Sequence, residues 1–326
     1  MTGPACPNCQ NLAASADRYC ENCGAQLFAS ASLPDMNGTY RPAASARSED
    51  TALTAAAVSD RGLVRLRNED AFALAAVDGR CAVVVCDGVA STPCADRAAN
   101  AAASAALEVL RGALRATDEV GSGAAAGFLR MAVERAQSAA AQVRADPSNG
   151  GGISPSTTLV AALTYPGRMG IAHVGDSRAY WVPDEVGAGQ LNGGATATLL
   201  TEDDTVGREA IAGGASESEA MRLPRARTIT GWLGADADSF DPHLLSVTVD
   251  SPGTLVLCTD GLWQYYDDPD DMAALVRSAR LTDASCLGLA RELTDAAVRK
   301  GGADNVTVAV VTVQPARLVL ASGMEE

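Results

Sequence analysis

The chain of 326 residues is 47% hydrophobic and 20% charged, which suits one large domain with a small appendage. Its formal net charge of −15 disfavours nucleic acids and anionic membranes as main partners, because both attract proteins through Lys and Arg. No apolar run approaches the ~20 residues that cross a bilayer, and the N-terminus lacks a basic region followed by an apolar stretch. The sequence therefore predicts a cytoplasmic protein.

Four cysteines near the N-terminus have the spacing of metal ligands. Cys6, Cys9, Cys20 and Cys23 form two Cys-x-x-Cys pairs. Four thiolates on two facing turns complete a tetrahedral zinc site without an open position, so the metal would be structural. Two disulfides or a redox pair are the alternatives, and they fit a chain without a secretion signal less well. Residues 1–28 resemble the short zinc ribbons of bacterial regulatory proteins, which implies docking to an unknown protein partner.

Residues 29–50 are rich in Ala, Ser, Pro and charge without an apolar period, which indicates a flexible linker. From residue 51 to 314, apolar runs such as CAVVVC, TTLVAALTY and TLVLC end in turn signals, which predicts antiparallel strands. Ala-rich and amphipathic stretches predict helices over 95–114, 124–144, 269–279 and 284–300. The predicted fold class is α+β, with helices covering antiparallel sheets, and residues 315–326 form a tail.

Acidic residues recur where predicted strands give way to turns. They lie in the strings RLRNEDAF, VVVCDGVAS, LCTDGLW and GGADNVTV. An Asp at a strand end, followed by Gly, lets the side chain and the adjacent carbonyl face a ligand. Taken singly, each Asp-Gly is more typical of a hairpin turn. Together, several such ends can gather oxygen ligands around magnesium or manganese.

The order of the motifs adds to this interpretation. The chain reads, in sequence, SDRGLVRLRNEDAF, CDGVAS, STTLVAAL, VGDSRAYW, LTEDDT, TITGWLG, CTDGLWQYY and GGADNVTVAVV. From about residue 54 to 313 it therefore resembles the metal-dependent serine/threonine protein phosphatases of the type-2C or PPM family, in its bacterial branch. The resemblance implies two packed antiparallel sheets flanked by helices, an α/β/β/α sandwich. It also implies hydrolysis of phosphoserine and phosphothreonine in proteins, counteracting serine/threonine kinases in bacterial signalling.

The resemblance also implies two bound manganese or magnesium ions, with a third ion as an option. It further implies which residues bind the two ions. Asp87 matches the ligand that bridges both metals, and Gly88 matches a carbonyl ligand of the second. The full set of matching ligands is Glu69, Asp70, Asp87, Gly88, Asp260 and Asp304. The two ions would activate a water for direct attack on phosphorus. For a third ion, Asp146 is the nearest upstream acid.

In the resemblance, Arg65 matches the arginine that binds the substrate phosphate. An arginine suits this role because its guanidinium can donate two parallel hydrogen bonds to a phosphate. Arg65 and Asp87 are therefore the predicted catalytic residues. The string DGVAS departs from the family, since Val89 stands where some relatives place a proton-donating His, and Asp204 stands where His is common. His173 is predicted to pack in a strand and His243 to lie in a turn, and neither is assigned a role.

Two other functions remain open from the sequence. One is a catalytically weak or dead phosphatase fold that binds phosphoproteins as a scaffold. The core aspartates are all present, which favours the enzyme. The other is a phosphatase dedicated to one small regulator. In each case the expected partners are phosphorylated proteins, among them a kinase or its substrates. Nucleic acids and membranes are not expected partners.

Overall fold

The computed structural model of the chain describes residues 54–77, 79–115, 122–144, 154–184, 197–237 and 241–316. The predicted zinc ribbon with Cys6, Cys9, Cys20 and Cys23, the predicted linker and nearly all of the predicted tail lie outside these residues, as does Asp146. None of the helices in the described ranges has the length and apolar character that a membrane span requires.

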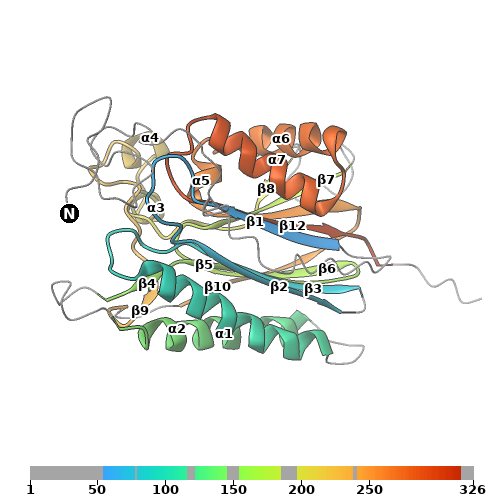
Figure 1. The fold of residues 1–326 in the computed structure, drawn as a ribbon, viewed down its shortest axis with the longest axis horizontal. Coiled ribbons are helices and arrows are strands. Elements are labelled where there is room, and N and C mark those ends of the chain that lie inside the picture. Colours follow the sequence, from blue (N-terminus) through green and yellow to red (C-terminus); the bar gives the residue numbers. More distant parts are fainter. Residues whose placement is uncertain are drawn as a thin grey trace, which may run out of the picture.

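Two five-stranded antiparallel sheets lie face to face (Figure 1). The first has the order β1-β12-β11-β7-β8, with bounds Thr54–Asp60, Val306–Val313, Gly253–Cys258, Arg178–Pro183 and Thr198–Leu199. The second has the order β10-β6-β5-β3-β2, with bounds His243–Thr248, Arg168–Val174, Leu159–Tyr165, Arg80–Cys86 and Ala71–Val77. A short pair joins β4 (Ser156–Thr157) to β9 (Leu233–Gly234).

The strand β3 shows how a sheet packs on both of its faces, against the other sheet on one side and against helices on the other. Alternate side chains of a strand point to opposite faces. Val83 and Val85 belong to the cluster between the two sheets, whereas Ala82 and Val84 belong to the cluster under the helices. Because both faces are covered, nearly the whole strand is buried, and its sequence is a continuous apolar run rather than an alternating one.

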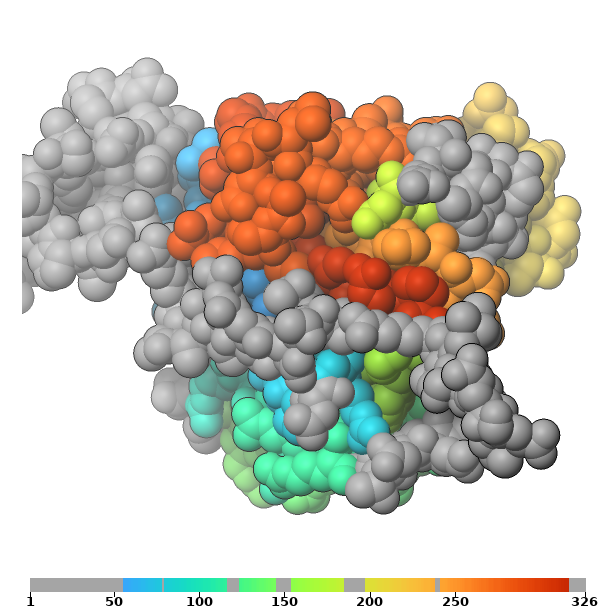
Figure 2. All heavy atoms as spheres, turned by 90° about the vertical axis from the view of Figure 1, so that its right-hand side faces the viewer, coloured from blue at the N-terminus to red at the C-terminus, as the bar shows by residue number. Residues whose placement is uncertain are grey.

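Helices cover both outer faces of the sandwich, as predicted. α1 (Ala95–Arg115) and α2 (Ser122–Ala141) lie against the second sheet, and α6 (Pro269–Thr282) and α7 (Cys286–Arg299) lie against the first. An end view shows α6 and α7 in orange and α1 in turquoise on opposite sides of the strands (Figure 2). The predicted bounds differ from the observed ones by only a few residues. The α+β class and the packed antiparallel sheets are therefore confirmed.

Three short helices were not predicted. α3 (Val206–Ala212) and α4 (Glu217–Ala220) lie in the stretch of residues 205–231, called the α3–α4 segment below, and α5 (Asp260–Trp263) follows β11. Each is too short for an apolar period to show in the sequence. α3 and α4 begin at the capping residues Thr205 and Ser216, whose side chains accept hydrogen bonds from backbone N–H groups of the first turn.

The prediction of a turn at His243 is wrong. His243 is the first residue of β10 and pairs with His173 of β6. The two imidazole rings stack with centroids 4.6 Å apart, and His243 Nε2 lies 2.8 Å from Asp204 Oδ1. These contacts from distant residues favour a strand directly after Pro242. His173 is buried, as predicted.

Candidate active site

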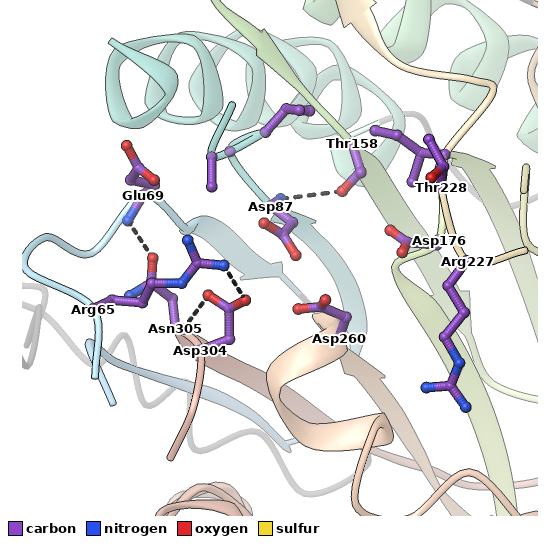
Figure 3. A pocket seen from close by; sticks show the side chains of 14 residues that line it. Arg65, Glu69, Asp87, Thr158, Asp176, Arg227, Thr228, Asp260, Asp304 and Asn305 are labelled. Carbon is purple, nitrogen blue, oxygen red and sulfur yellow. Dashed lines mark hydrogen bonds and ion pairs between the residues drawn. The ribbon is translucent and has the colours of Figure 1, made fainter. Parts of the chain in front are cut away.

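The loops at one end of the sandwich form a pocket of about 260 Å³. They follow β1, β3, β6 and β11 and precede β12, so both sheets contribute to its walls. Six residues predicted from the motifs line this pocket: Arg65, Glu69, Asp87, Gly88, Asp260 and Asp304. Figure 3 shows the side chains of Arg65, Asp87, Asp260 and Asp304 around a common space. The structure thus brings together residues that are separated by up to 239 positions.

Asp87 directly follows β3 and is fixed through its backbone. Its N–H donates to Thr158 Oγ1 at 3.1 Å, and its carbonyl accepts from the Thr158 N–H at 2.8 Å. The Thr157 hydroxyl donates to the same carbonyl at 2.8 Å. A Cβ on the next residue, Gly88, would lie 2.5 Å from the Glu69 carbonyl. Glycine is therefore required here because the backbone before β2 passes so close, and the Asp87 side chain is left free for the pocket.

Asp260 begins α5, and Asp304 lies in the turn before β12. A Cβ on Gly261 would overlap the Asn305 carbonyl oxygen, so glycine lets these two segments come into contact. Gln264, one turn later in the chain, donates to Asp260 Oδ2 at 2.5 Å. The close backbone contact explains why two acids from different segments lie on the same wall of the pocket.

Arg65 and Asn305 organise the loop between β1 and β2. Arg65 Nη2 lies 2.5 Å from Asp304 Oδ2. The buried Asn305 side chain accepts from the Glu69 N–H and donates to the carbonyls of Arg61 and Arg67, each at 2.8 Å. Both N–H groups and the oxygen of this amide are thus used to hold the loop, and Asn305 acts as a positioning residue for Arg65 and Glu69.

Asp70 is buried behind the pocket rather than lining it. Its Oδ2 accepts hydrogen bonds from Thr259 Oγ1 at 2.9 Å and Thr307 Oγ1 at 2.8 Å. Its Oδ1 is buried and has no hydrogen-bond partner among the described residues. Burial raises the pKa of Asp70 to about 7, since desolvation disfavours the charged carboxylate and Asp260 and Asp304 add repulsion.

The pocket carboxylates repel one another. Burial raises the pKa of Asp87 well above its usual value, and the nearby Asp70 and Asp260 raise it further. Burial and the Asp304 charge raise the pKa of Asp260 to about 6. Such a cluster of acids destabilises the folded protein unless a cation compensates its charge. Clusters of this kind are common at functional sites.

Sequence reasoning missed three residues that line the pocket. Asp176 lies between β6 and β7, and burial together with Asp260 raises its pKa to about 8. It lies at a strand end within the string VGDSRAYW, but Gly175 precedes it and Ser177 follows it, so the Asp-Gly rule used for Asp87 did not select it. Asn305 and Arg227 also line the pocket. For these two the sequence offers no local signal, because their roles depend on contacts with distant segments.

Comparison with known proteins identifies the class to which this fold and pocket belong. The family model for protein phosphatase 2C matches residues 64–295, so the chain belongs to the protein phosphatase 2C family. The match covers the loop with Arg65 and the segments of Asp87 and Asp260. The relatives described next are bacterial serine/threonine phosphatases, the class that the motifs predicted.

Two curated relatives are similar over most of this chain. The serine/threonine protein phosphatase PstP of Mycobacterium tuberculosis is 31% identical over 261 residues, which is 79% of this chain and 44% of that protein. The serine/threonine phosphatase stp of Listeria monocytogenes is 27% identical over 265 residues, which is 78% of this chain and 93% of that protein. The chain thus spans less than half the length of the mycobacterial relative.

A solved structure agrees with the fold. The catalytic domain of the serine threonine protein phosphatase PstP, in complex with two manganese ions, is 29% identical with a TM-score of 0.57. The match covers 81% of this chain and 99% of that one.

Proposed function

We propose that this chain hydrolyses phosphoserine and phosphothreonine in proteins and so counteracts serine/threonine kinases in bacterial signalling. The observation that carries the proposal is the convergence of Arg65 and five acids on one pocket: Glu69, Asp87, Asp176, Asp260 and Asp304. Family membership supports the same reaction, since the relatives are serine/threonine phosphatases. The alternative of a dead scaffold is not favoured.

The donor set fits two manganese or magnesium ions, which prefer carboxylate and carbonyl oxygens. Cations would relieve the repulsion that raises the pKa values of Asp87 and Asp260, and the buried Asp70 Oδ1 has no other partner. In the part of the chain that the structure describes, no three His, Cys, Asp or Glu side chains already surround a common ion position. We assign the ligands as Glu69, Asp70, Asp87, Gly88, Asp260 and Asp304. Bound ions would supply an activated water and neutralise charge on phosphate oxygens.

Arg65 would orient the substrate. One of its guanidinium nitrogens binds Asp304, and 38% of the side chain is exposed, so other N–H groups can donate to phosphate oxygens. A thiol nucleophile is disfavoured, because burial raises the pKa of both Cys86 and Cys258. Direct attack by water therefore suits the site better than a phosphoenzyme.

Turnover should depend on divalent metal. With manganese or magnesium, the purified chain is expected to hydrolyse p-nitrophenyl phosphate and a phosphothreonine peptide, and excess EDTA should reduce both rates to background. The physical reason is that the pocket acids alone repel a phosphate. Restoring manganese should restore the rates. Turnover that survives EDTA, or none with either metal from a folded protein, would contradict the proposal and, in the second case, support the scaffold.

We further propose that residues 1–28 form a structural zinc ribbon that docks a protein partner, joined by the linker of residues 29–50 to the phosphatase domain. The two Cys-x-x-Cys pairs support this. Metal analysis by mass spectrometry should find about one zinc per chain. The Cys20→Ser/Cys23→Ser variant should lose it, whereas the control Cys94→Ser should keep it. Equal zinc in both variants would refute the ribbon.

We also infer a cytoplasmic location. Within the described residues, Cys81, Cys86, Cys94 and Cys258 are not part of a disulfide, which suits a reducing compartment.

A further inference from the structure

The segment that contributes Arg227 to the pocket contains a basic run that the reaction itself does not require. Residues 220–235 contain three arginines and no acid, in a chain where 40 acidic residues outnumber 25 basic ones. Arg222, Arg225 and Arg227 are all exposed. Acidic residues flank this run on both sides in the sequence, so the positive charge is confined to a short stretch.

Arg227 is the member of this run that lines the pocket. Figure 3 shows it across the pocket from Arg65, with Asp260 and Asp176 between them. A phosphoryl group held at Arg65 and the acids would thus leave Arg227 beside the neighbouring part of the substrate. This placement suits a contact with the peptide rather than with the reacting phosphate.

The Arg227 guanidinium is available for a ligand. Its side chain is 62% exposed, and its nearest acid, Asp267, lies 3.9 Å away, which is too long for a hydrogen bond. Asp267 already accepts a 2.6 Å hydrogen bond from the buried Arg178. Arg227 can therefore bind another anion without breaking a hydrogen bond of the folded protein.

The backbone around Arg227 is held in place by the rest of the α3–α4 segment. The Gly207 N–H donates to the Ala226 carbonyl at 2.8 Å, and the Val206 N–H donates to the Thr228 carbonyl at 3.1 Å. A rim that is already ordered costs less entropy when it binds a peptide.

Resting on the proposed phosphatase activity, we propose that Arg227 selects substrates that carry an anionic side chain near the phosphorylated residue. The ligand chemistry is a carboxylate or a second phosphate, because a guanidinium binds either through two parallel hydrogen bonds.

The test compares kcat/KM for matched phosphothreonine peptides, assayed with manganese. One peptide has neutral neighbours, a second series carries Asp at one position from −4 to +4, and a third carries a second phosphothreonine. Wild type should prefer at least one anionic peptide by about fivefold, as expected for a partly exposed ion pair. Arg227→Ala should lose most of this preference, Arg227→Lys should keep part of it, and Arg111→Ala, an exposed control on α1, should keep all of it. The preference should shrink at high salt.

The outcomes separate this proposal from the phosphatase itself. A preference for Asp identifies a carboxylate, and one for the second phosphate identifies a multiply phosphorylated substrate; either supports the proposal. No preference in a wild type that hydrolyses p-nitrophenyl phosphate would overturn it. The proposal would also be overturned if Arg227→Ala lowered kcat/KM equally for p-nitrophenyl phosphate and for every peptide. That result would mean that Arg227 only supports the pocket. No hydrolysis of any substrate by wild type would instead refute the proposed function.

Discussion

Replacement of Asp87 by alanine is expected to lower kcat/KM for p-nitrophenyl phosphate by about 10³-fold or more, which corresponds to roughly 4 kcal/mol of transition-state stabilisation. Asp87 lies among the pocket acids, and the metal ions proposed above would lose a shared ligand. Asp260→Ala should have an effect of similar size. The assay is steady-state turnover with saturating manganese. The control is Glu134→Ala, which removes an exposed carboxylate from α2 and should leave turnover unchanged.

Thermal unfolding of the metal-free variants distinguishes lost chemistry from lost folding. The raised pKa of Asp87 means that its carboxylate is unfavourable in the folded state at neutral pH, so removing it should leave the melting temperature equal or higher. The backbone bonds from Thr157 and Thr158 do not depend on the side chain. An inactive Asp87→Ala that also melts well below wild type, or one within tenfold of wild-type activity, would contradict the proposed role.

Replacement of Arg178 by methionine is expected to lower the free energy of unfolding by about 3–5 kcal/mol. The buried guanidinium binds both oxygens of Asp203, at 2.9 and 2.7 Å, and donates to Asp267 at 2.6 Å. It also stacks on the Trp263 ring, 3.9 Å from the centroid. Removing it would leave Asp203, which is only 7% exposed, as a buried charge without its partner.

Urea unfolding of four proteins measures this effect: wild type, Arg178→Met, Asp203→Leu and the double variant. Arg178→Met leaves the buried Asp203 without its partner, and Asp203→Leu leaves the buried Arg178 paired with Asp267 alone. The double variant removes both buried charges, so it should be more stable than either single one. The exposed pair of Arg130 and Asp241, 3.2 Å apart, is the control, and Arg130→Ala should cost less than about 1 kcal/mol. Additive losses at Arg178 and Asp203 would show that the pair is not coupled.

Elements with their own repeating pattern could be predicted from the sequence. α1 buries small residues spaced three and four apart, and its predicted start at residue 95 agrees with the structure. The apolar run of β3 was likewise recognisable. Asp87, Asp260 and Asp304 could be assigned to one pocket because each lies in a recognisable motif at the end or start of a strand.

The rest depends on partners that a local pattern cannot show. The Asn305 side chain bonds to Glu69, 236 residues earlier in the chain. The buried charge of Arg178 is tolerable only because Asp203 and Asp267 meet it. His243 follows a proline, which suggested a turn, but pairing with His173 extends the strand to it. Long-range contacts of this kind outweigh local preference.

The position of β12 has a consequence for how the protein matures. β12 lies between β1 and β11, so the last described strand pairs with the first, and Asp304 closely precedes it. During synthesis, a chain that has not yet released residues 304–313 from the ribosome lacks both an inner strand of one sheet and an acid of the pocket. The high sequence separation of these contacts also predicts slow folding. Catalytic competence should therefore appear only after synthesis of the whole domain is complete.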